Sequence, residues 1–247
     1  QPDITDIHKY PSLGMPSRHI SKDVTDFFGV KTHQYFNEPA HFYPYGDDCY
    51  KIRILPKDFR LIGKPKKLFG QQRFNNGKML VITEGEIDTL AVAQAMMDTS
   101  KTIYPVVSIP SANQLSLLLE HRSWIKRFNE VILWFDNDQA GKECTRQAAK
   151  IIGFDRVKVV EADEKDASDL YSSKGSKAVT NAIWGAQKYN PAGIISGENI
   201  WDKFMERQNT ESCPYPDCLS GLNEKLKGMR HGEITLFTSG TGSGKST

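Results

Sequence analysis

The stretch VILWFDNDQAGKE, residues 131–143, joins an apolar run to two aspartates that lie one residue apart. The run that ends at Phe135 is predicted to be a buried strand, so Asp136 and Asp138 follow its carboxyl end. Two carboxylates this close repel each other and raise each other's pKa unless a cation lies between them. The stretch therefore predicts a cation site at the end of a strand.

Strand-like and helix-like segments alternate on both sides of this stretch. Runs of apolar residues predict four strands, over residues 78–84, 104–110, 130–136 and 156–162. The spacing of apolar residues predicts helices between them, over residues 86–98, 112–121 and 138–152. This alternation is typical of a parallel sheet covered by helices. In such sheets, sites form beyond the carboxyl ends of the strands, where Glu84 and Asp136 fall.

The composition predicts a folded protein rather than a disordered one. The 247 residues carry a formal net charge of +2, with 25% charged and 38% hydrophobic residues, and have room for roughly one or two domains. No apolar run approaches the roughly 18 residues of a membrane span, and no leader-like segment opens the chain. The four cysteines are too scattered for a disulfide framework, and Cys213 and Cys218 lack the second ligand pair that zinc needs. We therefore expect an intracellular protein that binds neither a membrane nor zinc.

A second acidic motif, TEGEID, occupies residues 83–88. Glu84 follows a predicted strand, and Asp88 lies one helical turn further on. Acidic residues at such junctions also make good helix caps, and we prefer that explanation for Glu86 and Asp163. Two acidic motifs at strand ends, in this order, favour a shared metal site instead. Carboxylate oxygens suit Mg²⁺, and two such ions can assist an in-line phosphoryl transfer.

A basic segment precedes the acidic motifs. Residues 51–73 contain eight Lys and Arg residues and one acid, Asp58, with phenylalanines interleaved. A cationic run is commonly a solvated surface, but this one lies just before the acids. Lys and Arg neutralise backbone phosphates and aromatic rings can stack on bases, so we expect contact with nucleic-acid or nucleotide phosphates. The candidate residues are Lys57, Lys64, Lys66, Lys67 and Arg73.

The C-terminal part begins with a predicted linker. It contains an amphipathic helix whose apolar face comprises Ile200, Trp201, Phe204 and Met205. A strand then leads into SGTGSGKST, residues 239–247, a phosphate loop in which Ser239 replaces the first glycine. The residues expected to contact ATP phosphates or their magnesium are Gly242, Gly244, Lys245 and Ser246. Because the chain starts at Gln1 and stops inside this motif, we expect a piece of a longer polypeptide that does not hydrolyse ATP.

Four segments together carry a resemblance to a known family: VITEGEID, YPVVSIP, WFDNDQAGKE and EKDASDL. They resemble the TOPRIM-containing primase region of the bifunctional primase–helicases of short-tailed phages and of their mitochondrial relative, Twinkle. The resemblance implies that Glu84 and Asp88 are catalytic, with Glu84 as the acid–base candidate. It also implies that Mg²⁺ or Mn²⁺ is held by four carboxylates, those of Glu84, Asp136, Asp138 and Asp166.

The sequence thus predicts an α/β fold in four parts. A TOPRIM domain, with a central and mostly parallel sheet flanked by helices, is expected over residues 76–187. A mixed α+β basic subdomain over residues 1–75 would precede it. A linker with the amphipathic helix would follow over residues 188–212, and the start of a RecA-like helicase domain over residues 213–247. The apolar face of the linker helix has two explanations, docking on a neighbouring subunit and packing within its own chain.

The activity that the resemblance implies is DNA priming, the synthesis of RNA primers from ribonucleoside triphosphates on single-stranded DNA. The full-length protein would form a hexamer through its helicase domain, whereas we expect this chain to be monomeric. Its location would be a host cytoplasm if viral, and a mitochondrion or plastid if organellar. Two alternatives stay open: a Twinkle-like domain that binds DNA and organises a helicase without making primers, and a TOPRIM nuclease that uses the same metals.

Overall fold

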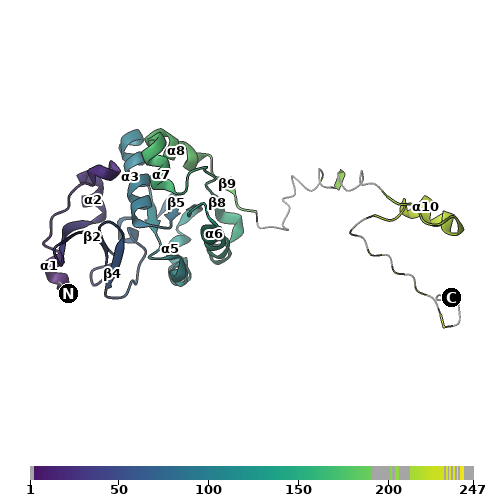
Figure 1. The fold of residues 1–247 in the computed structure, drawn as a ribbon, viewed down its shortest axis with the longest axis horizontal. Coiled ribbons are helices and arrows are strands. Elements are labelled where there is room, and N and C mark those ends of the chain that lie inside the picture. The colour runs from purple at the N-terminus through teal and green to yellow at the C-terminus, as the bar shows by residue number, and fades with distance from the viewer. Residues whose placement is uncertain are drawn as a thin grey trace. The chain divides into compact units, whose positions relative to one another are not determined.

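The structure, a computed structural model, describes residues 3–190 and 212–230, with isolated positions at 201, 204, 205, 232, 234, 236, 238, 240 and 241. The chain divides into two compact units, Gln1–Pro191 and Ala192–Thr247 (Figure 1). Within the described part, no helix combines the length and apolarity needed to cross a membrane.

The first unit begins with a four-stranded antiparallel sheet in the order β1-β2-β3-β4. Its strands are β1 (Lys31–Tyr35), β2 (Glu38–Pro44), β3 (Tyr50–Ile54) and β4 (Asp58–Ile62). Three short helices precede it: α1 (Ile4–Ile7), η1 (Pro16–Arg18) and α2 (Lys22–Phe28). One face of the sheet packs Phe42 and Ile52 against Ile7 of α1. Because side chains alternate along a strand, the opposite face carries the residues between these, including Lys51 and Arg53.

A five-stranded sheet in the order β6-β5-β7-β8-β9 forms the rest of the first unit. Its strands are β5 (Gly77–Thr83), β6 (Val106–Ser108), β7 (Phe128–Trp134), β8 (Val157–Val159) and β9 (Gln187–Lys188). The first four are parallel, and β9 pairs with β8 in the antiparallel sense. The expected central, mostly parallel sheet is therefore confirmed. A short 3-10 helix, η2 (Gln71–Arg73), connects the two sheets.

Helices flank the second sheet in two groups (Figure 1). One group contains α3 (Glu86–Ser100), α7 (Ala167–Lys174) and α8 (Ser176–Trp184), which pack on one another. The other contains α4 (Ser116–Glu120), α5 (Arg122–Ile125) and α6 (Gln139–Ile152). The connection from β5 to β6 runs toward one edge of the sheet, and the connection from β7 to β8 runs toward the opposite edge. Right-handed crossovers in opposite directions place α3 and α6 on opposite faces. The carboxyl ends of β5 and β7 therefore meet where the strand order reverses.

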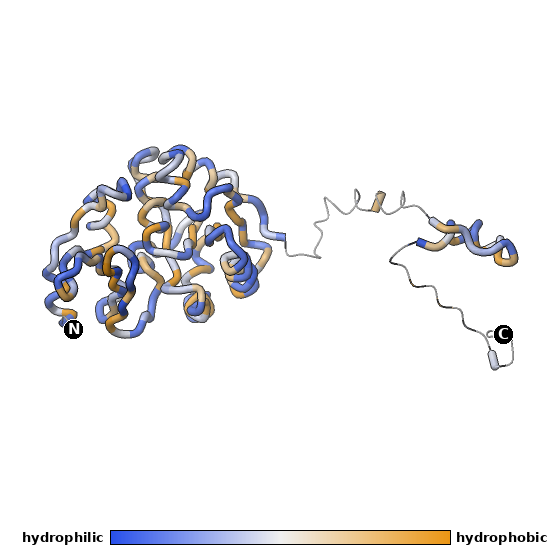
Figure 2. Tube along the Cα trace, viewed as in Figure 1, coloured by the Kyte–Doolittle hydropathy of each residue, from blue (hydrophilic) through white to orange (hydrophobic). Residues whose placement is uncertain are grey.

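The apolar strands form the main core. Leu80, Ile82, Val131 and Leu133 of β5 and β7 are fully buried, and hydrophobic stretches alternate with hydrophilic ones along the trace (Figure 2). The helix expected over residues 112–121 is wrong in detail. Residues Ala112–Gln114 form the 3-10 helix η3, and the α-helix α4 covers only Ser116–Glu120, while α5 begins beyond the predicted segment.

The second unit is described mainly between residues 212 and 230. There the backbones of Cys213 and Met229 form an isolated antiparallel β-bridge. Between them, η5 (Asp217–Leu219) precedes α10 (Ser220–Leu226). Within the expected linker helix, Trp201, Phe204 and Met205 are exposed, and Ile200 lies outside the described residues. The phosphate-loop residues Gly242, Gly244, Lys245 and Ser246 also lie outside them, so their roles stay predictions.

Candidate metal and nucleotide site

The parallel pairing of β5 with β7 brings the first acids of the two motifs together. Thr83 is opposite Trp134, so Glu84 and Asp136 both leave the sheet at its carboxyl edge. The Asp136 backbone N–H donates to Glu84 Oε2 at 3.3 Å. Burial, followed by the negative charges of Asp136 and Asp138, raises the pKa of Glu84. These three carboxyl groups therefore share one electrostatic environment.

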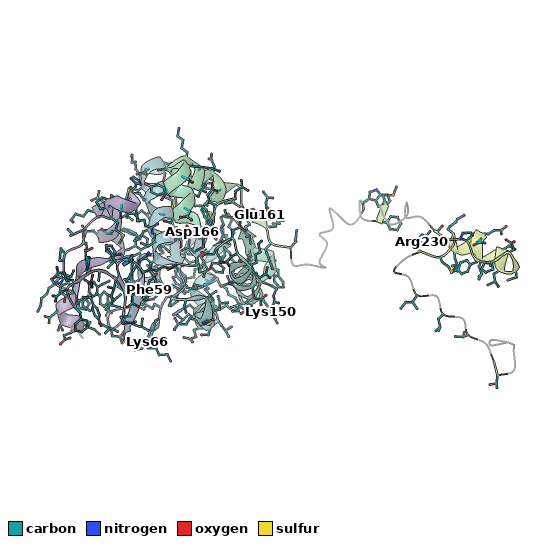
Figure 3. All side chains as sticks on the ribbon, in the orientation of Figure 1. Phe59, Lys66, Lys150, Glu161, Asp166 and Arg230 are labelled. Carbon is teal, nitrogen blue, oxygen red and sulfur yellow. The ribbon has the colours of Figure 1, made fainter. Side chains whose placement is uncertain are left out.

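The remaining two acids, the buried Asp88 and the partly exposed Asp166, form a pair beside the first group. Asp88 lies in the first turn of α3, and its Oδ1 accepts the Ser168 backbone N–H at 3.1 Å. Burial and then the charge of Asp166 raise the pKa of Asp88 well above its usual range, and the charge of Asp136 adds to this effect. Asp136 thus raises the pKa of both Glu84 and Asp88, which links the two groups into one acidic cluster (Figure 3 labels Asp166).

Two of the five acids also begin helices. Asp138 Oδ1 accepts the Gly141 backbone N–H at 2.8 Å at the start of α6. Asp166 Oδ1 accepts the Asp169 backbone N–H at 2.8 Å at the start of α7. Each aspartate therefore has one oxygen in a helix cap, which fixes the position of its carboxylate.

Gly141, in the first turn of α6, lies very close to the backbone of Asp136. A Cβ atom added to Gly141 would lie 2.0 Å from the Asp136 carbonyl oxygen and 2.8 Å from its carbonyl carbon. Only glycine lets the first turn of α6 approach the strand end this closely. This approach brings Asp136 and Asp138 to the same edge of the sheet.

A lysine that the sequence analysis did not single out lies within the cluster. Lys165 Nζ is 3.0 Å from Asp136 Oδ2, and the Lys165 side chain is 57% exposed. The Asp136 carboxylate holds the pKa of Lys165 above its usual range. The Asn137 backbone N–H donates to the Lys165 carbonyl at 2.7 Å, and the Asn137 side chain donates to the Ala162 carbonyl at 2.9 Å. These bonds join the loop after β7 to the loop before α7, which also carries Asp166.

The cluster suits a hard divalent cation in its donor atoms and charge. All five groups offer carboxylate oxygens, and burial, followed by the negative charge of neighbouring acids, raises the pKa values of Glu84 and Asp88. Among the described residues, no three His, Cys, Asp or Glu side chains converge on one point in their present rotamers. A cation at Asp136 would have to replace Lys165, whose exposed side chain has solvent to move into. The oxygen donors are therefore of the type that hard divalent cations take, whereas the arrangement of these donors around an ion stays a prediction.

The five candidate basic residues are spread over several elements. Lys57 lies in the turn between β3 and β4, and Arg73 ends η2 with its guanidinium 5.9 Å from the centre of the Phe27 ring. Lys64, Lys66 and Lys67 follow β4, and Lys66 pairs with Asp48 at 2.9 Å on the exposed surface (Figure 3). The structure does not gather these residues into one cluster, and their contact with phosphates stays a prediction.

Two cations that the candidate set omits share a face with an aromatic ring. Lys51 is opposite Leu61, and Arg53 is opposite Phe59, in the pairing of β3 with β4. Lys51 Nζ lies 5.1 Å from the centre of the Phe59 ring, and Arg53 Cζ lies 5.7 Å from it (Figure 3 labels Phe59). The alternation of these cations with Tyr50, Ile52 and Ile54 is the sequence signal that could have found them.

Comparison with known proteins agrees with this geometry. A family model described as Toprim-like matches residues 81–171. The DNA helicase/primase of Enterobacteria phage T3 is 33% identical over 205 residues, which are 80% of this chain and 35% of that protein. A Twinkle homolog protein, chloroplastic/mitochondrial, of Arabidopsis thaliana is 26% identical over 216 residues, which are 79% of this chain and 30% of that protein. The chain thus spans about a third of the length of these curated relatives.

The same fold occurs in a solved structure from bacteriophage T7. That structure contains a lagging-strand DNA polymerase that interacts with primase domains bound to an RNA/DNA hybrid and dTTP. The matching chain has a TM-score of 0.64 and 27% identity, over 71% of this chain and 92% of that chain. The α/β architecture expected from the sequence is therefore confirmed as a TOPRIM-type primase fold.

Proposed function

We propose that this chain is the primase core of a replicative primase–helicase. The premise is that it contains a Toprim-like domain and is similar to phage primase–helicases and to a Twinkle homologue. The observation that carries the proposal is the cluster of five acids near the ends of β5 and β7. It lies within the same unit as the cationic face of the first sheet, which carries Lys51 and Arg53 of β3 beside Phe59 of β4. The reaction joins ribonucleotides: the 3′-hydroxyl of one attacks the α-phosphate of the next, and pyrophosphate leaves.

The acidic cluster would serve the chemical step. Two Mg²⁺ or Mn²⁺ ions, held by Glu84, Asp136, Asp138 and Asp166, would supply charge neutralisation to the attacking and leaving oxygens. Burial and the neighbouring acids raise the pKa of Glu84, which favours this carboxylate as the acceptor of the 3′-hydroxyl proton. Asp88 accepts a hydrogen bond from the start of α7, so it would align that helix and Asp166 with the site.

The basic residues would hold the template and the nucleotides. Single-stranded DNA and ribonucleoside triphosphates are both polyanions, and cationic side chains neutralise their phosphates. The T7 primase domains are bound to an RNA/DNA hybrid and dTTP, which supports the same ligand classes for this chain. Lys57, Lys64, Lys66, Lys67 and Arg73 are the proposed contacts, and Arg53 with Phe59 is added from the structure.

The role of the C-terminal part is proposed from the phosphate-loop motif and the resemblance to primase–helicases. We expect a complete helicase domain to assemble a hexamer, with the phosphate loop at Lys245 and Ser246 contributing to its ATP site. The two acidic motifs lie before Pro191, in the first unit, and the phosphate-loop motif lies after it. Primer synthesis by residues 1–191 is therefore proposed independently of ATP hydrolysis.

One incubation distinguishes the proposed activity from the two alternatives. A short oligoribonucleotide, labelled at its 5′ end and annealed to single-stranded DNA, is incubated with the chain, four ribonucleoside triphosphates and Mg²⁺. A primase core lengthens the labelled strand in steps of one nucleotide. A nuclease shortens it, and a Twinkle-like binding domain retards the duplex in a native gel without changing its length.

A further inference from the structure

Glu86 lies between two site acids in the sequence, yet it makes its contacts with the other half of the first unit. It is the first residue of α3, as expected of an acid at a helix start. Its side chain is buried, however, with an exposed fraction of only 5%. A buried carboxylate is costly unless charged and hydrogen-bonding partners compensate it. Both of its partners come from the segment around the first sheet.

Lys51 of β3 is the charged partner. Its Nζ lies 2.9 Å from Glu86 Oε1 and 3.2 Å from Glu86 Oε2, and it donates to the Pro110 carbonyl at 2.8 Å. An ammonium group has three N–H donors and no acceptor. Two hydrogen bonds and one close ion-pair contact therefore hold the Lys51 ammonium against Glu86 and Pro110. The ammonium joins three segments: β3, the start of α3 and the residues just after β6.

Tyr45, just after β2, supplies the neutral partner. Its hydroxyl donates to Glu86 Oε1. Burial, and then the charge of Glu86, raises the pKa of Tyr45 well above its usual range, so the phenol keeps its proton and remains a donor. Tyr45 is fully buried and belongs to the main core, which fixes its position.

We propose that Glu86, Lys51 and Tyr45 form a positioning network that sets the acidic cluster at the correct distance from the cationic face of the first sheet. The network holds the start of α3, and with it Glu84 and Asp88, against β3. In this arrangement Lys51 is a positioning residue rather than a phosphate ligand. The inference rests on the proposed function, because it assigns the network a role in the same site.

The first test compares extension kinetics of Lys51→Met, Glu86→Gln and the double variant. Displacing α3 should lower kcat roughly tenfold or more in each single variant, because misplaced reacting groups slow the chemical step. The KM for ribonucleotides should stay within about twofold of wild type, since binding groups remain. The double variant should be no slower than the slower single variant, because the two changes break the same interaction.

A matched ion pair provides the control. Lys158 and Glu130 pair at 2.7 Å between β8 and β7, with side chains 34% and 29% exposed. Lys158→Met and Glu130→Gln should lower the melting temperature without lowering kcat. A raised KM in Lys51→Met with an unchanged kcat would overturn the proposal, because it would identify Lys51 as a phosphate ligand. Multiplicative losses in the double variant would also overturn it.

A second measurement does not depend on activity or on a disruptive substitution. Tyr45→Phe removes only the hydroxyl donor to Glu86. Amide hydrogen exchange in the first turn of α3, at Thr89, whose N–H donates to the Gly85 carbonyl, should be several-fold faster in Tyr45→Phe and Lys51→Met than in Lys158→Met. Equal exchange in all three would refute the network. This result holds even if wild type extends no primer, so failure of the network and failure of the proposed function are distinguishable.

Discussion

At the scale of single residues, the site depends on one glycine and on the charge of its acids. Glu84 and Asp136 follow apolar strands, and Asp88 and Asp138 lie in the first turn of predicted helices, so their positions could be read from the sequence pattern. Asp166 came from the family resemblance alone. Lys165 beside Asp136 and Lys51 beside Glu86 were not predicted. Lys51 lies 35 positions before Glu86 in the chain, and only the packing of the two sheets brings such residues together.

Gly141→Ala should damage both stability and activity. The added methyl would lie 2.0 Å from the Asp136 carbonyl oxygen, so α6 or the end of β7 must move. We expect a loss of about 1–3 kcal/mol in the free energy of unfolding, as for other overpacked positions. Urea unfolding measures it, with Gly221→Ala as the control because a Cβ there contacts nothing within 4 Å. Equal stabilities of the two variants would contradict the close approach.

The raised pKa values of Asp88 and Glu84 predict how stability varies with pH without divalent cations. An acid whose pKa is raised by folding binds more protons in the folded than in the unfolded state. The free energy of unfolding should therefore fall as pH rises from about 4, the unfolded value, through the raised pKa values. Above that window the loss is complete.

Asp88→Asn should remove much of this pH dependence. The amide keeps an oxygen for the Ser168 N–H but carries no charge, so the variant should be more stable than wild type at neutral pH without metal. Urea unfolding between pH 4 and 8 measures the difference, with the exposed Asp155→Asn as control. A variant less stable than wild type throughout would contradict the pKa assignment.

At the scale of elements, the strands were more predictable than the helices around them. β5 and β7 are near-continuous apolar runs, and their predicted positions agree with the structure to within about two residues. The segment 112–121 was predicted as one helix because its leucines have helical spacing, whereas Ala112–Gln114 form a 3-10 helix and only Ser116–Glu120 form an α-helix. The spacing of apolar residues alone does not distinguish a 3-10 turn from the first turn of an α-helix.

The dual role of Asp138, as helix cap and as proposed metal ligand, can be separated by two substitutions. Asp138→Asn keeps an oxygen for the Gly141 N–H, whereas Asp138→Ala does not. The alanine variant should be less stable than the asparagine variant by about 1 kcal/mol, the usual value of a helix N-cap. Primer extension should fall strongly in both. If asparagine preserved full extension, Asp138 would be a structural cap only.

At the scale of the whole molecule, the division at Pro191 predicts that the first unit is self-sufficient. Both sheets, all five acids and the positioning network lie before this residue. A chain ending at Pro191 should retain the extension rate and the unfolding midpoint of the first unit, measured by oligoribonucleotide extension and by calorimetry. A loss of the cooperative unfolding transition would show that residues 192–247 support the fold. The phosphate loop, whose motif ends outside the described residues, stays a prediction from the sequence.

The most direct test of the central claim is the rate of ribonucleotide addition to an oligoribonucleotide annealed to single-stranded DNA. Wild type, Asp136→Asn and the control Asp155→Asn are compared at saturating Mg²⁺. The account predicts extension by wild type and by Asp155→Asn, and a loss of at least about a hundredfold in Asp136→Asn, as expected when a metal-dependent phosphoryl-transfer site loses a carboxylate. Extension by Asp136→Asn at the wild-type rate would contradict the assignment of this acidic cluster as the polymerising site.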